Sequence, residues 1–275
     1  MLTRNNLHTY QQDIIKQAAS LPCVGLLLPP GLGKTATTLT IIAEQCKGRT
    51  LIIAPKKVAE SVWSEEVTKW DHLKHLRVSK ILGNPKERVE AVQKEADIYI
   101  INLENVVWLT ELKIPMTKFN NLIIDESSRF KDSSTKRFKA LKPFLKQFKR
   151  RIILTGTPTP QGYADLWSQV AILDLGQRLE TSLTKFRTKY MQPGKRNPHT
   201  GVVYNWELQK GADHAITQKI EDICFSLKAE DYLQLPSLTN LYHEIEIESA
   251  IRKQYDRSEE HTSELQSRLH LVCRL

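Results

Sequence analysis

Short, uniformly apolar runs alternate with helical patterns through the first part of the chain. The runs cover residues 23–28, 51–54, 98–101, 122–124 and 152–154. Strands that are apolar on both sides, with helices between them, are typical of a parallel sheet covered on both faces. The sequence therefore predicts an α/β fold whose ligands bind at the carboxyl ends of the strands.

The pattern changes after about residue 175. Residues 179–191 and 212–227 look helical, whereas residues 241–247 alternate apolar and polar side chains, as a half-exposed strand does. We therefore predict an α/β domain over 1–175, an appended, mostly helical subdomain over 176–236, and the beginning of a further domain over 237–256.

The tail of the chain reads differently from the rest. Residues 257–267 resemble the conceptual translation of a common sequencing-adapter oligonucleotide, and residues 268–275 look like read-through of the same origin. We expect the biological sequence to stop near Asp256, so that 257–275 is a non-native tail. A short polar C-terminal helix is the alternative, and the underlying nucleotide sequence distinguishes the two.

Composition restricts the function only weakly. The formal net charge of +9 is compatible with a polyanionic partner but does not require one. Basic residues gather over 131–151, where a solvated helix face explains the run as well as a phosphate-binding patch does. No apolar run approaches the roughly 20 residues of a membrane span, so we expect no membrane partner. Four scattered cysteines and the absence of an apolar signal core favour unpaired thiols and a cytoplasmic protein.

A glycine-rich segment follows the first apolar run and opens the first helical pattern. Gly31 and Gly33 let backbone N–H groups curl around phosphate oxygens without an obstructing Cβ. Lys34 is placed to reach the β- and γ-phosphates, and the hydroxyl of Thr35 is placed to bind Mg²⁺. The segment predicts ATP and Mg²⁺ as ligands, although Leu28 occupies the first glycine position of the full phosphate-loop pattern.

Two carboxylates, Asp125 and Glu126, end another apolar run. Asp125 is suited to hold Mg²⁺, since magnesium prefers few carboxylates together with phosphate oxygens and water. Glu126 is suited to polarise the water that attacks the γ-phosphate. Acidic pairs at strand ends also occur as helix caps, but the phosphate loop in the same chain favours catalysis. The expected catalytic residues are Lys34, Asp125 and Glu126, with Thr35 and Asp125 as metal ligands.

Two other segments carry weaker signals. Thr155, Gly156 and Thr157 follow the last apolar run, where their hydroxyls and turn are placed to couple the phosphate state to nucleic acid. Gln11 precedes the first run, and a side-chain amide can read adenine through paired hydrogen bonds. A plain turn is the alternative for 155–157, and a place on a helix surface is the alternative for Gln11.

Together these segments resemble the motifs of the first RecA-like lobe of superfamily 2 helicase-like ATPases, closest to the Swi/Snf branch and its phage and bacterial members. The matching segments are 10–11 (adenine motif), 31–35 (motif I), 54–56 (motif Ia), 125–131 (motif II, D-E-x-H-R-x-K) and 155–158 (motif III). The resemblance covers about 7–256 and implies a RecA-like parallel sheet flanked by helices. It implies that the nucleotide is held by Gln11, Gly31, Leu32, Gly33, Lys34 and Thr35, and the nucleic-acid backbone by Pro55, Lys56 and Lys57.

The chain departs from the branch at two positions. Ser128 stands where His is usual and Gln161 where Asn is common. The resemblance also implies a second RecA-like lobe in cis that supplies arginine fingers, worth about 10³–10⁵ in rate. Residues 237–256 look like the entry into that lobe, and nothing after them matches its motifs. We therefore expect a truncated motor that binds ATP·Mg²⁺ weakly and hydrolyses it slowly.

The resemblance implies that the intact parent is a DNA-dependent ATPase that moves along double-stranded DNA, as a monomer, in a bacterial or phage-infected cell. Two other functions compete with this one. A phosphotransferase would need an acceptor site, for which no candidate is visible. A non-catalytic nucleic-acid-binding module would use motif Ia and the basic segment 131–151, and Lys34 would be irrelevant to it.

Overall fold

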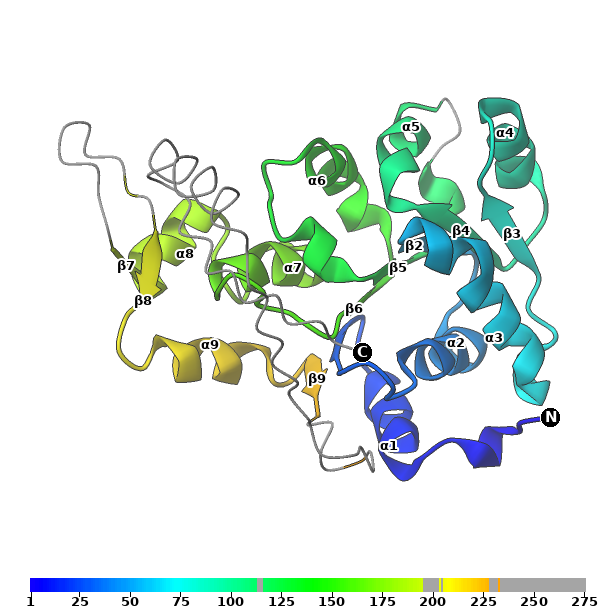
Figure 1. Ribbon diagram of the computed structural model, residues 1–275, viewed down its shortest axis with the longest axis horizontal. Coiled ribbons are helices and arrows are strands. Elements are labelled where there is room, and N and C mark those ends of the chain that lie inside the picture. The colour runs from blue at the N-terminus through cyan, green and yellow to red at the C-terminus, as the bar shows by residue number, and fades with distance from the viewer. Residues whose placement is uncertain (113–115, 195–202, 204, 228–231, 233–275) are drawn as a thin grey trace, which may run out of the picture. The chain divides into compact units, whose positions relative to one another are not determined.

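Parallel strands form the central sheet of the computed structural model, in the order β3–β4–β2–β5–β6–β1–β9 (Figure 1). The strands are β1 (Cys23–Leu27), β2 (Thr50–Ala54), β3 (Val78–Ile81), β4 (Ile98–Asn102), β5 (Asn121–Asp125), β6 (Arg150–Leu154) and β9 (Cys224–Ser226). Each of the predicted apolar runs is one of these strands. The prediction of an α/β fold with a parallel sheet is confirmed.

The structure describes residues 1–112, 116–194, 203, 205–227 and 232. The chain divides into two compact units, Met1–Leu233 and Gln234–Leu275, and every described residue belongs to the first. The expected strand at 241–247, the domain entry at 237–256 and the tail at 257–275 therefore lie outside the described residues and stay predictions. Within the described ranges, no helix is long and apolar enough to cross a membrane.

Helices cover both faces of the sheet (Figure 1). One face carries α1 (Thr9–Ala18), α2 (Lys34–Gln45) and α3 (Trp63–Lys69), and the other carries α4 (Pro85–Gln93), α5 (Val106–Glu111), α6 (Lys136–Leu141) and α7 (Ala164–Asp174). Because successive strand residues point to opposite faces, Ile52 packs with the first group and Leu51 with the second. Both are fully buried, which explains why the inner positions of the central strands are apolar on both sides.

The segment after α7 returns to the sheet. It contains α8 (Leu183–Tyr190), a two-stranded antiparallel sheet of β7 (Met191–Pro193) and β8 (Trp206–Leu208), α9 (Ala212–Ile220), and then β9. The predicted helix over 212–227 is wrong at its end, since α9 stops at Ile220 and Cys224–Ser226 pairs with β1. The free edge of β1 supplies the reason: the backbone N–H of Gly25 donates to the carbonyl of Ile223 (2.7 Å).

Replacing Gly25 with alanine tests this pairing. A Cβ at Gly25 would lie 2.7 Å from Cys224 Sγ and 3.5 Å from Leu173 Cδ1, so we expect the substitution to lower the free energy of unfolding by about 1–3 kcal/mol. Cys224→Ala removes the sulfur, so the double variant should lose less stability than the sum of the two single variants. Urea unfolding of the four proteins measures this coupling, and strictly additive losses would contradict the placement of β9.

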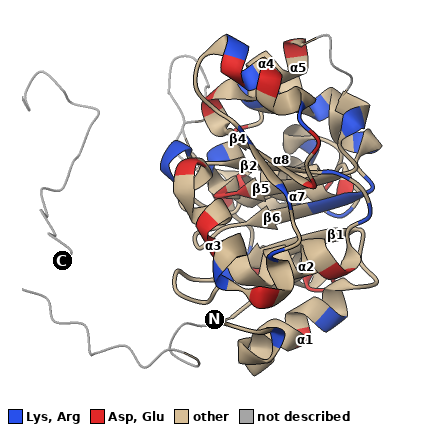
Figure 2. Cartoon of the chain, turned by 90° about the vertical axis from the view of Figure 1, so that its right-hand side faces the viewer, with Lys and Arg blue, Asp and Glu red and all other residues tan. Residues whose placement is uncertain are grey.

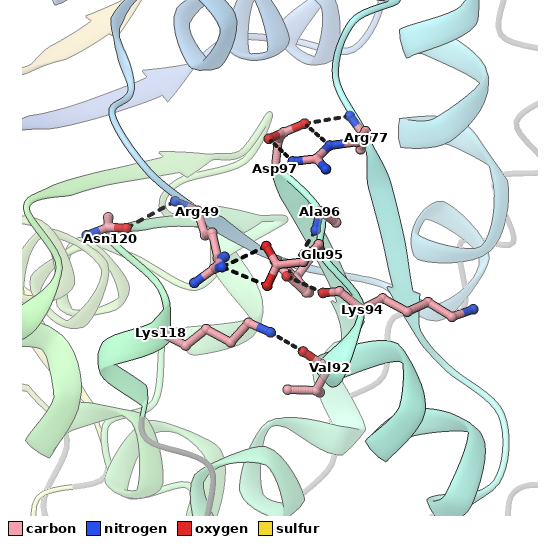
Figure 3. Close-up of polar contacts among 10 residues, drawn as sticks. Arg49, Arg77, Val92, Lys94, Glu95, Ala96, Asp97, Lys118 and Asn120 are labelled. Atoms are coloured by element: carbon pink, nitrogen blue, oxygen red, sulfur yellow. Dashed lines mark hydrogen bonds and ion pairs between the residues drawn. The ribbon is translucent and has the colours of Figure 1, made fainter.

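Ion pairs link the segments at the edge of the sheet where the strands begin (Figure 3). Arg49, just before β2, contacts the Glu95 carboxylate through Nη2 at 2.8 Å and 2.9 Å. Arg77, before β3, pairs with Asp97 at 3.2 Å, and the backbone N–H of Arg49 donates to Asn120 Oδ1 at 3.0 Å. Exposed pairs of this kind each contribute little, about 0–1 kcal/mol. The motif residues lie instead at the carboxyl ends of the strands.

Candidate active site

The loop between β1 and α2 is shaped by its glycines. Gly31 has a φ of +88° and Gly33 a φ of +63°, both in the left-handed region. Gly33 caps α2, and a Cβ there would lie 2.4 Å from Gln11 Nε2. Two features therefore require glycine at position 33: its left-handed backbone conformation and the side chain of Gln11 packed against it. The loop delivers Lys34 and Thr35 to the first turn of α2, where the helix dipole favours anions.

Gln11 braces this loop from α1. Its Oε1 accepts from the backbone N–H of His8 (2.8 Å), and its Nε2 donates to Thr37 Oγ1 (3.1 Å) and to the carbonyl of Gly33 (3.3 Å). The residue is 3% exposed, so its alternative placement on a helix surface is wrong. Both ends of the amide are engaged, which means that Gln11 would exchange these hydrogen bonds to read a base. Its adenine role stays a prediction.

The Lys34 ammonium folds back onto the loop that precedes it. Nζ donates to the carbonyls of Leu28 (2.7 Å) and Pro29 (3.1 Å). Burial lowers the pKa of Lys34, while the negative charges of Asp125 and Glu126 oppose that shift. The ammonium therefore lies in the field of both carboxylates and is held by two neutral acceptors that an anion could replace.

Asp125, at the end of β5, is oriented by hydrogen bonds to both oxygens. Oδ2 accepts from the indole N–H of Trp63 (3.0 Å), and Oδ1 accepts from the backbone N–H of Glu126 (2.9 Å). Burial raises the pKa of the Asp125 carboxyl, and these two bonds counteract the shift. Trp63 is fully buried. These two hydrogen bonds hold the carboxylate in one orientation, and a metal site needs ligands that are held in this way.

Glu126 has left-handed backbone geometry, with a φ of +54°, which is uncommon for a residue with a Cβ and costs energy. Its Oε1 accepts hydrogen bonds from Ser128 Oγ and from Thr155 Oγ1, the latter at 3.3 Å. Thr155 is fully buried and also accepts from the backbone N–H of Thr157 (3.1 Å). The acidic pair and the segment 155–157 are therefore joined by direct hydrogen bonds, which a plain turn would not need.

The segment 155–157 also abuts the glycine-rich loop. A Cβ at Gly156 would lie 3.1 Å from Pro30 Cδ and 3.5 Å from the carbonyl of Leu28. The ends of β1, β5 and β6 therefore bring three of the predicted segments to one place, and Gln11 joins them from α1. Within the glycine-rich loop, the side chain of Leu32 is fully buried. Thr35, next to Lys34 in the chain, is half-buried.

A second set of hydrogen bonds holds this arrangement from behind. Ser127 Oγ donates to Gln169 Oε1 (2.7 Å), and Gln169 Nε2 donates to the carbonyls of Pro158 (2.6 Å) and Asp165 (2.9 Å). Gln169 is fully buried in α7. Gln169 is not among the residues predicted from the sequence, although an amide between Trp167 and Val170 in a largely apolar helix is a signal of a buried polar role.

The predicted nucleic-acid residues follow β2 on the same edge of the sheet. Lys56 and Lys57 are exposed, and Pro55 is half-buried. Lys56 Nζ lies 3.9 Å from Glu60 Oε1, a separation at which an exposed ion pair is weak. Lys57 precedes a π-helical turn, Val58–Val62, that leads into α3. Both lysines are thus open to solvent, and their contact with nucleic acid stays a prediction.

The basic segment 131–151 does not act as one surface. Arg150 is buried, where it donates to the carbonyl of Ala18 and to Gln45 Oε1. Arg151 donates to the carbonyls of Leu145 and Leu173. These two arginines tie helices to the sheet, which leaves Arg137 and the lysines of the segment for a ligand. Across the molecule, basic and acidic residues are interspersed on the helices of both faces (Figure 2).

The cysteines carry no visible chemistry. Cys23, Cys46 and Cys224 are free thiols, as predicted, and Cys273 lies outside the described residues. Burial raises the pKa of Cys46 to about 11 and that of Cys224 to about 12. Since the thiolate is the reactive form, these two groups are inert near neutral pH.

Known proteins resemble this chain in both sequence and fold. The family model of the SNF2-related domain matches residues 10–272. Protein p41 of Acyrthosiphon pisum secondary endosymbiont phage 1 is 31% identical over 91% of this chain and 56% of its own length. The DNA annealing helicase and endonuclease ZRANB3 of Bos taurus is 26% identical over 86% of this chain and 22% of its own length.

Among solved structures, the SWI2/SNF2 ATPase core of Sulfolobus solfataricus in complex with dsDNA superposes with a TM-score of 0.63 and 25% identity. The match covers 82% of this chain and 45% of that one. The chain therefore spans about half the length of the phage relative and of the archaeal core.

Proposed function

This chain belongs to the SNF2-related domain family, and from that premise we propose that it is the ATP-binding lobe of a DNA-dependent ATPase, whose whole form moves along double-stranded DNA. The observation that carries the proposal is that the phosphate loop, segment 155–157 and the acidic pair adjoin at one edge of the sheet. Lys34 donates to the carbonyl of Leu28, Gly156 lies beside that carbonyl, and Thr155 donates to Glu126. A cation for phosphate, an oriented carboxylate for a metal and a second carboxylate for water are the parts that phosphoryl transfer needs.

The residues present fit ATP and Mg²⁺. Gly31 and Gly33 place no Cβ at two positions of the loop, and their left-handed backbone directs it into the N-terminus of α2. Lys34 and Thr35 would hold the phosphates and the metal from the helix, and Asp125 would hold the metal from β5. When bound, magnesium neutralises charge on the phosphate oxygens.

Glu126 is the residue that we assign to the attacking water. Its carboxylate already accepts hydrogen bonds from Ser128 and Thr155, so its remaining lone pairs are limited and directed. Thr155 connects Glu126 to the turn that ends β6. A change in the charge near Glu126 would therefore alter the hydrogen bond from Thr155 and with it the position of segment 155–157. This supports a coupling role for Thr155, Gly156 and Thr157.

The DNA part of the proposal has two supports. The archaeal core that shares this fold was solved with dsDNA, and this chain exposes Lys56 and Lys57 at the same sheet edge as the nucleotide site. Phosphate contacts by lysine supply affinity without sequence preference. Such binding suits a protein that moves along a duplex.

We further propose that hydrolysis requires a second lobe. This chain corresponds to 45% of the archaeal ATPase core. Among the described residues, no arginine side chain forms a hydrogen bond with Lys34, Asp125 or Glu126. An arginine supplied from outside the lobe is typically worth about 10³–10⁵ in rate. The chain by itself is therefore expected to bind ATP and to turn it over slowly.

The test is ATP turnover with and without duplex DNA, for this chain and for a version extended by the C-terminal half of a phage relative. We expect DNA-stimulated turnover, about 10³-fold faster, only in the extended protein, and its loss in a Lys34→Ala version. Equal activity of the short chain would sink the second-lobe proposal. DNA binding without Lys34-dependent turnover in either protein would favour the non-catalytic module.

A further inference from the structure

A groove is lined by residues of α6, of α7 and of the 3₁₀ helix Lys142–Gln147. The helices α6 and α7 lie on the face of the sheet that α4–α7 cover (Figure 1). Its volume is about 430 Å³, within the usual range of roughly 300–1,000 Å³ for ligand pockets. The floor is apolar and is formed by Phe138, Leu145, Trp167 and Ala171. A groove of this size and lining accepts one or two large apolar side chains.

The groove lies at the opposite edge of the sheet from the nucleotide site. Arg151, near the start of β6, donates to the carbonyl of Leu145, which lines the groove, and to the carbonyl of Leu173 near the end of α7. Lys34, Asp125 and Glu126 lie instead where strands end. An occupant of the groove would leave the nucleotide site open.

Two lysines form one side of the groove. Lys142 and Lys146 line it, and both are exposed. Neither has a carboxylate within ion-pair distance in the part of the chain that the structure describes. Lys139 and Lys149 on the same segment are exposed as well. An apolar floor with an unpaired cationic rim complements a ligand that is apolar at one point and anionic around it.

Other polyanions match this groove less well. Duplex DNA offers phosphates for the rim but no apolar group for the floor. A membrane surface would be met by protruding apolar side chains, yet the large exposed ones among the described residues are Met1, Leu2, Val62 and Tyr232, and none lines the groove. We propose that the groove docks an acidic peptide segment of a partner protein, with a large apolar side chain on the floor and carboxylates against Lys142 and Lys146.

Fluorescence anisotropy with a labelled probe peptide, Asp-Asp-Asp-Asp-Leu-Phe, tests the proposal on the whole chain. Two control peptides carry serine in place of the apolar pair, or asparagine in place of the aspartates. We expect the probe to bind at least about tenfold more tightly than either control, and Lys142→Glu/Lys146→Glu to weaken probe binding by about tenfold or more. Lys86→Glu/Lys94→Glu reverses two exposed lysines elsewhere and should leave probe binding unchanged.

Ala171→Leu fills the groove and tests the apolar contact separately. It should weaken the probe without changing ATP binding, which also shows that the variant is folded. Equal binding of the all-polar acidic peptide would overturn the proposal, as would full probe binding by the charge-reversed groove. Loss of duplex binding in that variant, with the probe unaffected, would assign the lysines to nucleic acid instead.

Discussion

Replacing Lys34 with alanine is expected to weaken ATP binding by about 10–100-fold, because a charge-assisted hydrogen bond is worth about 1.5–3 kcal/mol. The ammonium now donates to the carbonyls of Leu28 and Pro29, so phosphate oxygens would replace neutral acceptors with charged ones. Calorimetric titration with ATP·Mg²⁺ measures the loss. In a protein that carries the second lobe, hydrolysis should fall by a further factor of about 10²–10³.

The pH dependence gives this prediction a second readout. Burial lowers the pKa of Lys34, so the ammonium loses its proton at a lower pH than an ordinary lysine does. ATP affinity of the unaltered chain should therefore fall as pH rises through that lowered pKa, whereas the alanine variant should lack this decline. Lys86→Ala, at an exposed lysine of α4, is the matched control. Tight ATP binding by the Lys34 variant would show that the phosphate loop is misassigned.

The sequence predicted the strands that are buried on both faces and missed those that are not. The inner residues of β2 and β5 are all apolar and buried, which leaves little choice of structure. β3 reads Val-Ser-Lys-Ile, with Lys80 exposed at the sheet edge, so its pattern resembles a loop as much as a strand. β9 is too short to carry a period, and its apolar residues continue the helical pattern of α9. Residues 224–226 become a strand because they pair with the otherwise unpaired edge of β1.

Site residues could be predicted where the residues that act together are neighbours in the sequence. Gly33, Lys34 and Thr35 act through one loop, so their spacing along the chain contains the information. The bond from Trp63 to Asp125 joins residues 62 positions apart, and the bond from Ser127 to Gln169 joins residues 42 positions apart. Such contacts depend on how helices pack on the sheet. For that reason sequence spacing alone could not have given them.

Charge was the least informative signal. The basic run that ends in Arg150 and Arg151 fitted a solvated helix face as well as a phosphate-binding patch, but the guanidinium groups of these two residues donate to main-chain carbonyls. A guanidinium has five N–H donors, which makes it suited to bridging several helix ends inside a domain. Composition cannot separate an arginine used in this way from one that faces DNA.

Ser128, which stands where the Swi/Snf branch usually has a histidine, contacts the carboxylate of Glu126. Its hydroxyl donates to the same Glu126 oxygen that Thr155 reaches. The resemblance to the Swi/Snf branch implies a histidine at this position, and a serine supplies a shorter donor that bonds within its own segment. Ser128 therefore holds the Glu126 carboxylate without reaching other parts of the protein, and Thr155 remains the connection to segment 155–157.

Glu126→Gln is expected to separate nucleotide binding from hydrolysis. Glutamine keeps a side-chain carbonyl, so the hydrogen bonds from Ser128 and Thr155 can persist and the free energy of unfolding should change little. The variant cannot take up a proton from water, and loss of a general base typically costs about 10²–10⁴ in rate. ATP affinity of this chain should stay within about threefold, while turnover of the extended protein should fall by at least about 100-fold.

Ser128→Ala is the matched control, because it removes a donor to Glu126 and leaves the carboxylate in place. We expect it to slow turnover much less than Glu126→Gln does. If Glu126→Gln hydrolyses ATP at the original rate, the carboxylate serves only to accept the hydrogen bonds from Ser128 and Thr155, and the water must be positioned by another group. If it loses stability together with activity, its hydrogen bonds matter more than its basicity. Only lost turnover with unchanged ATP binding and unchanged unfolding assigns the proton transfer to Glu126.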